Sequence, residues 1–158
     1  MQKKKVGIPV VVGILIAEAV GALSALLAGG FGDLYTELVQ PPLAPPGWLF
    51  PVAWTILYAL MGAASGLIYA LAGCTPVGKN ALTLYAVQLT LNFSWSIIFF
   101  RFQALGLSVA VILLLTLMVI WTTVAFYRIK PLAGYLLIPY ILWLLFASYL
   151  NIGVLVLN

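Results

Sequence analysis

The chain has 158 residues, of which 65% are hydrophobic and 6% charged, and its net charge is +4. A water-soluble domain of this size could not hide so large an apolar fraction, because even folded monomers expose much of their surface. One cysteine and no histidine exclude an internal disulfide and remove the commonest metal and haem ligands. We therefore expect a protein of the lipid bilayer with no metal site and no cofactor of its own.

Five apolar stretches of about 20 residues follow one another along the chain. They cover about residues 6–28, 51–72, 80–100, 104–126 and 132–156. Each is long enough, as a helix, to cross a hydrocarbon core of roughly 30 Å. The apolar–polar alternation of membrane β-strands does not occur. The sequence therefore predicts a single domain over residues 1–158, an all-α membrane protein built as a five-transmembrane-helix bundle.

The positive charges predict how the bundle is oriented. With five spans, one side receives Lys3, Lys4, Lys5, Lys79, Arg128 and Lys130, and the other receives Arg101 alone. Because cytoplasmic segments are enriched in Lys and Arg, we expect a cytoplasmic N-terminus and an outside C-terminus in a multi-pass protein of the cell membrane. The start resembles a signal peptide, but residues 6–28 are longer than a signal core and are interpreted as a retained helix. The charge is thus a topology signal, and no nucleic-acid partner is expected.

Only the first connection, residues 29–50, is long, and it is rich in proline. Pro41, Pro42, Pro45 and Pro46 stiffen it and limit the entropy that it loses on ordering. Loops of this length without regular structure of their own are often lids or binding elements. The sequence therefore predicts a lid.

Small residues recur at every fourth position of the first span, at Gly13, Ala17, Gly21, Ala25 and Gly29. Residues four apart share a helix face, and small side chains let a second backbone approach closely. Packing inside the bundle is the favoured interpretation. The seam of a homodimer is the alternative, and the repeat alone does not separate the two.

Polar and aromatic residues share helix faces in three of the spans. The groups are Trp54 with Tyr58, Gln88 with Asn92 and Trp95, and Trp143 with Ala147 and Leu150. Amides in hydrocarbon need hydrogen-bond partners, so Gln88 and Asn92 should point into the bundle. They could bridge helices while the indoles sit in interfacial belts. Alternatively, the groups line an apolar cavity with aromatic walls and a few polar handles, which suits a flat apolar ligand.

Glu18 is the single acid inside a span, near the middle of the first one. An intramembrane carboxyl group is a candidate functional residue by default, although it can also simply face a neighbouring helix. No catalytic arrangement is evident, because the chain lacks a histidine base and a phosphate-binding glycine loop.

Three ordered blocks of residues resemble a known family. The first runs from Tyr35 to Tyr58 through Leu38, Pro41, Pro45-Pro46, Trp48, Phe50-Pro51 and Trp54. The second is Gln88-Leu89-Thr90-Leu91-Asn92-Phe93-Ser94-Trp95 with Phe99-Phe100. The third is Pro139-Tyr140-Ile141-Leu142-Trp143 with Phe146-Ala147 and Leu150-Asn151. Across all five spans the chain resembles the translocator protein family, also called tryptophan-rich sensory proteins or peripheral-type benzodiazepine receptors.

The resemblance implies a five-helix bundle, commonly a homodimer, that binds porphyrins such as protoporphyrin IX and related hydrophobic small molecules. The family's pocket lies beneath the first loop, and its lining carries over to Trp54, Tyr58, Gln88, Asn92, Trp95, Trp143, Ala147 and Leu150. Tyr35, Pro45 and Trp48 would belong to the lid.

The leading hypothesis is a membrane protein that binds tetrapyrroles for their transport, sensing or disposal. The alternative is a light- and oxygen-dependent porphyrin-degrading activity, for which the resemblance nominates Trp54 and Trp143 as the participating indoles. A third possibility is a membrane scaffold in which the small-residue face matters more than the cavity.

Overall fold

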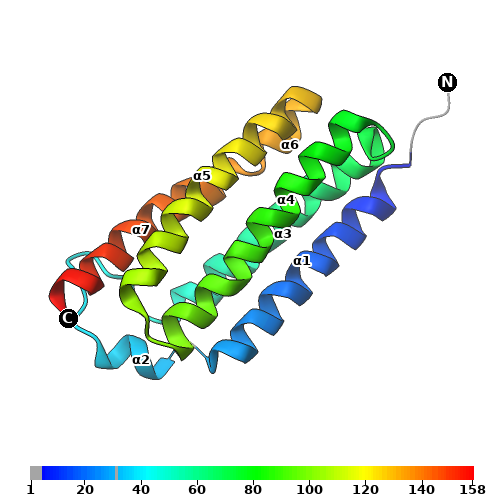
Figure 1. Cartoon of the computed structure of the whole chain (residues 1–158). Coiled ribbons are helices and arrows are strands. Elements are labelled where there is room, and N and C mark those ends of the chain that lie inside the picture. The colour runs from blue at the N-terminus through cyan, green and yellow to red at the C-terminus, as the bar shows by residue number, and fades with distance from the viewer. Residues whose placement is uncertain (1–4, 31) are drawn as a thin grey trace.

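The computed structural model describes residues 5–30 and 32–158 of the chain. Within this part, five helices are long and apolar enough to cross a membrane. The long helices are α1 (Gly7–Ala28), α3 (Leu49–Ala72), α4 (Pro76–Ser96), α5 (Leu105–Ile129) and α7 (Ile138–Leu157). They run side by side along one axis (Figure 1), so the predicted all-α, five-helix membrane fold is confirmed.

Three short elements complete the bundle and modify the predicted boundaries. They are α2 (Gly32–Glu37) in the first connection, the π-helical turn η1 (Ile97–Arg101) after α4, and α6 (Pro131–Tyr135) before α7. The third span begins earlier than predicted because Thr75 caps α4. Its hydroxyl accepts the Gly78 N–H at 3.0 Å, and Pro76 follows as the first helical residue.

The closest helix pair is α1 with α3, and glycine makes this contact possible. A Cβ built on Gly13 would lie 2.2 Å from the Gly62 carbonyl oxygen, and one built on Gly66 would lie 2.2 Å from the Pro9 carbonyl oxygen. No side chain fits at these distances, so the two backbones touch directly. This contact supplies the packing that holds helices together where no hydrophobic drive exists between them.

The small-residue face of α1 is therefore used inside the bundle. Ala17 is fully buried, and the Tyr58 ring lies against the backbone of Gly21. Gly29 ends the helix with φ of +84°, a conformation that glycine adopts without strain. A homodimer stays a prediction, and it would need a surface other than the one that α3 covers.

The two ends of the bundle differ in charge and in structure. The N-terminal end of α1, the α3–α4 turn and α6 lie at one end, whereas α2 and the C-terminus lie at the other (Figure 1). Arg101 belongs to the second end, where its Nη1 donates to the Leu27 carbonyl oxygen at 3.1 Å. Lys3 and Lys4 lie outside the described residues. The assignment of either end to the cytoplasm stays a prediction.

The α1–α3 contact predicts the effect of one added methyl group. We expect Gly13→Ala to lower the free energy of unfolding by about 1–3 kcal/mol, because its Cβ meets backbone that cannot yield without separating the helices. Thermal unfolding in detergent, followed by circular dichroism, measures this. Gly106→Ala in α5 is the matched control, since nothing lies within 4 Å of its Cβ position. Equal stability of the two variants would contradict the proposed packing.

Candidate ligand-binding site

A cavity lies at the lid end of the bundle, between α3, α4, η1, α7 and the first connection. Its walls are formed by Tyr35, Gln40, Phe50, Trp54, Trp95, Phe99, Phe100, Ala147, Leu150, Asn151 and Val154. Most of these side chains are apolar or aromatic. The open space is about 40 Å³, far below the roughly 300–1,000 Å³ of pockets that hold drug-sized ligands. The cavity is therefore too small for such a ligand in this structure, with room for a few water molecules at most.

The aromatic wall depends on the π-helical turn η1. The Phe102 N–H bonds to the Ile97 carbonyl five residues back, at 3.1 Å, which widens the turn. As a result, Phe99 and Phe100 both reach the cavity. Phe99 stacks on Trp95 with ring centroids 5.3 Å apart, and the two phenylalanines meet edge to face at 4.8 Å. Such π-turns are frequent at functional sites.

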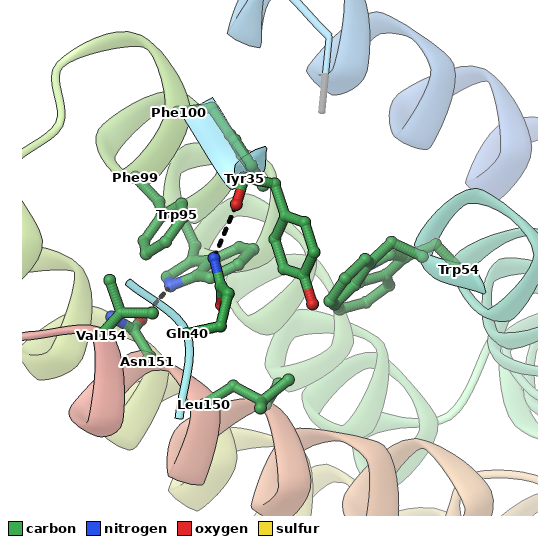
Figure 2. A pocket seen from close by; sticks show the side chains of 11 residues that line it. Tyr35, Gln40, Trp54, Trp95, Phe99, Phe100, Leu150, Asn151 and Val154 are labelled. Carbon is green, nitrogen blue, oxygen red and sulfur yellow. Dashed lines mark hydrogen bonds between the residues drawn. The ribbon is translucent and has the colours of Figure 1, made fainter. Parts of the chain in front are cut away.

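One polar pair sits in the cavity wall and connects three helices. Trp95 Nε1 donates to Asn151 Oδ1 at 2.9 Å, and Asn151 Nδ2 donates to the Ser108 hydroxyl at 2.9 Å. The bond between Trp95 and Asn151, drawn in Figure 2, holds the Trp95 ring in place. The Asn151 amide therefore lies at the edge of a cavity whose walls are mostly apolar.

A second polar cluster, which we call the amide network, lies away from the cavity. The Tyr58 hydroxyl donates to Asn92 Oδ1 at 2.8 Å, and Asn92 Nδ2 donates to the Tyr140 hydroxyl. The Tyr140 hydroxyl donates in turn to Gln88 Oε1 at 3.0 Å. All four side chains are buried. The network joins α3, α4 and α7 by hydrogen bonds that need no ligand.

The lid is ordered by contacts within itself and with α3. The Tyr35 hydroxyl donates to the Pro45 carbonyl oxygen, and Gln40 Nε2 donates to the Tyr35 carbonyl oxygen at 2.8 Å. The Tyr35 ring meets Phe50 edge to face at 5.0 Å. Burial raises the pKa of Tyr35, so its hydroxyl stays protonated and able to donate at physiological pH. Figure 2 shows Tyr35 lying between Trp54 and Gln40.

The lid is also tied to the end of α7. The Tyr149 hydroxyl donates to the Pro42 carbonyl oxygen at 2.7 Å. The Asn158 side chain pairs with the Val39 backbone, accepting from its N–H and donating to its carbonyl oxygen, both at 3.0 Å. Pro41 rests on Gly153, where an added Cβ would come within 2.6 Å of the ring. These three side-chain hydrogen bonds form what we call the latch.

Comparison with known proteins identifies the family to which this chain belongs. The sequence model of the TspO/MBR family matches residues 11–157. The chain belongs to the TspO/MBR family.

Relatives in this family come from distant organisms. The tryptophan-rich protein TspO of Chlorobaculum tepidum is 41% identical over 124 residues, 78% of each chain. The human translocator protein is 40% identical over 118 residues, which cover 74% of this chain and 70% of the human one. Protein CrtK of Rhodobacter capsulatus is 37% identical over 138 residues, 87% of this chain and 85% of its own. The resemblance drawn from the sequence blocks is thereby confirmed.

In this TspO/MBR-family protein, the predicted site residues fall into three groups. Tyr35, Trp54, Trp95, Ala147 and Leu150 line the cavity. Tyr58, Gln88 and Asn92 belong to the amide network and do not line it. The third group, which does not line the cavity, consists of Pro45, Trp48 and Trp143. The Pro45 carbonyl oxygen accepts the Tyr35 hydrogen bond. Trp48 is 68% exposed at the start of α3. A ligand-binding role for any of them stays a prediction.

The two indoles nominated for catalysis touch each other, but only one reaches the cavity. Trp54 and Trp143 meet edge to face with ring centroids 6.3 Å apart. Trp143 also packs between Phe50 and Phe146, and its buried Nε1 has no hydrogen-bond partner among the described residues. A catalytic role for either indole stays a prediction.

Six cavity residues were absent from the predicted set. Phe99, Asn151 and Val154 could have been found by extending the helical stripes of Trp95 and Ala147 by one or two turns. Phe100 lies in the π-turn η1, where regular helical spacing does not apply. Gln40 and Phe50 lie in or beside the lid, where no periodic pattern indicates which way a side chain points.

The amide network predicts a stability effect separate from ligand binding. We expect Asn92→Leu to lower the free energy of unfolding by about 1–3 kcal/mol, because the buried Tyr58 hydroxyl loses its acceptor. Thr90→Val is the control, since the exposed Thr90 hydroxyl bonds only to the Ala86 carbonyl of its own helix. Unfolding in detergent measures both. A loss no larger than that of Thr90→Val would show that the network does not hold the helices.

Proposed function

We propose that this protein binds porphyrins, protoporphyrin IX-like tetrapyrroles, and related hydrophobic ligands within the membrane, and acts in their transport, sensing or disposal. The main support for this proposal is the apolar cavity with aromatic walls beneath the first connection, residues 29–50, which the latch holds to α7. Membership of a family that includes the translocator protein and CrtK supports the proposal.

The cavity wall suits a flat conjugated ligand. Trp54, Trp95 and Phe99 offer ring faces and edges, and aromatic pairs gain about 0.5–1.5 kcal/mol beyond the burial of their area. Gln40 and Asn151 are the amides in the wall that can meet polar atoms at the ligand's edge. In this proposal the amide network supports the cavity from outside, and its members Gln88 and Asn92 do not line the cavity in this structure.

The lid has to move before a tetrapyrrole can enter, because the closed space is only about 40 Å³. Opening breaks the three hydrogen bonds of the latch. Each is worth about 0.5–1.5 kcal/mol net, so the opening costs a few kcal/mol, which thermal motion supplies. Lid motions of this kind occur on microsecond to millisecond timescales.

Titration with protoporphyrin IX tests the proposal. We expect saturable quenching of tryptophan fluorescence in the purified protein, because Trp54 and Trp95 line the cavity. Ala147→Phe should weaken binding at least tenfold by filling the space. Ala110→Phe, at an exposed position of α5, is the matched control and should bind like the original protein.

Two outcomes would contradict the proposal. Quenching that never saturates, or that free tryptophan in the same detergent reproduces, would favour the scaffold hypothesis. Equal weakening by Ala147→Phe and Ala110→Phe would place the ligand outside this cavity.

A further inference from the structure

A groove separate from the cavity opens on the side of the bundle between α1, α3 and the end of α4. It encloses about 150 Å³ and is lined by Glu18, Gly21, Ala22, Ala25, Pro51, Trp54, Thr55, Tyr58 and Ser96. Ala22, Pro51 and Thr55 are exposed, so the groove faces the surroundings of the bundle. Of the described residues, none of those in 29–50 lines the groove, and Trp54 is the one that it shares with the cavity.

The groove exists because α1 carries small residues at this level. Gly21, Ala22 and Ala25 leave space that larger side chains would fill. The Tyr58 ring packs onto Gly21, where an added Cβ would come within 2.4 Å of Tyr58 Cε2. An aromatic surface formed by Tyr58 and Trp54, whose ring centroids lie 5.7 Å apart, is thereby exposed to the groove.

Glu18 places a carboxyl group in this groove, about halfway along a membrane-spanning helix. No residue of the described chain forms a hydrogen bond or ion pair with it. Of the hydroxyls that line the groove, Tyr58 donates to Asn92 at 2.8 Å and Thr55 donates to the Pro51 carbonyl at 2.7 Å, while Ser96 is buried at the end of α4. An unpartnered carboxyl group at this depth is costly, which makes an external partner favourable.

We propose that the groove binds a lipophilic amine, with its nitrogen against Glu18 and its first carbons against Trp54 and Tyr58. A carboxylate pairs strongly with an ammonium group, and aromatic faces attract the same cation. A carboxylic acid beside a neutral amine and a carboxylate beside an ammonium differ only in where one proton sits. Both pairs are neutral overall, so binding brings no net charge into the hydrocarbon.

This site differs in chemistry from the proposed porphyrin site and does not rest on it. In its ionised form, Glu18 repels ligands that carry carboxylates of their own. A volume of about 150 Å³ admits an amine head with a short chain, whereas a tetrapyrrole needs the larger space that an open lid provides.

Dansylcadaverine, a fluorophore on a five-carbon primary amine, tests the inference in detergent micelles. We expect saturable, blue-shifted emission above that of protein-free micelles. N-acetyl-dansylcadaverine has the same fluorophore and chain without the basic nitrogen, and it should bind at least tenfold more weakly. This comparison needs no variant. Equal binding of the two probes would overturn the proposal.

Variants then locate the site. Glu18→Gln removes the carboxylate with little change of shape, and it should weaken amine binding at least tenfold while leaving the protoporphyrin IX titration unchanged. Ala22→Leu keeps Glu18 but fills the groove, and it should weaken amine binding similarly. Ala19→Leu is its matched control at an exposed position of the same helix outside the groove, and it should bind normally.

Two results would contradict this location. Undiminished amine binding in Glu18→Gln would show that the carboxyl group does not recognise the nitrogen. Equal weakening by Ala22→Leu and Ala19→Leu would show that the probe does not occupy the groove. A porphyrin titration that fails in the unaltered protein bears only on the proposed function, because the amine comparison is read independently of it.

Discussion

Hydrogen bonding inside lipid is the constraint on which the rest of this structure depends. Hydrocarbon offers no partner to a buried amide or hydroxyl, so polar side chains within the spans have to satisfy one another. Tyr58, Asn92, Tyr140 and Gln88 do so by forming a chain of bonds across α3, α4 and α7. Because these groups are at most a few per cent exposed, they fix how the three helices face one another. The glycine contact between α1 and α3 attaches a fourth long helix, α1, to these three, and we call the four connected helices the frame.

The frame divides the interior into regions of different chemistry. In the amide network, the four polar side chains are paired with one another. Toward the lid, the walls become aromatic, and Asn151 is held by Trp95 and Ser108. The first connection contacts the bundle through hydrogen bonds to the end of α7 and through the Tyr35 ring against Phe50 of α3. In the proposed function, the helices act as the base of the site and the first connection acts as its cover.

The fold could be predicted because runs of about 20 apolar residues have one stable form in a bilayer. The site was only partly predictable, and Asn92 shows why. Helical spacing indicates that an amide points inward, but the same spacing serves whether its partner is a ligand or Tyr140, which lies 48 residues away in the sequence. Phe100 reaches the cavity through a π-turn that depends on packing, and Gln40 depends on the conformation of the lid. The spacing of residues along a helix indicates which way a side chain points. Its hydrogen-bond partners, and any irregular turn of the backbone, depend on tertiary structure.

The central claim is that a tetrapyrrole occupies the lidded cavity while the amide network stays intact. An experimental structure of the complex with protoporphyrin IX tests this most directly. The account predicts the macrocycle against Trp54 and Trp95, with the latch between Tyr149 and Pro42 broken and the bond between Tyr58 and Asn92 preserved. A macrocycle bound on the outer surface of the bundle, or one that takes Asn92 as its own hydrogen-bond partner, would contradict it.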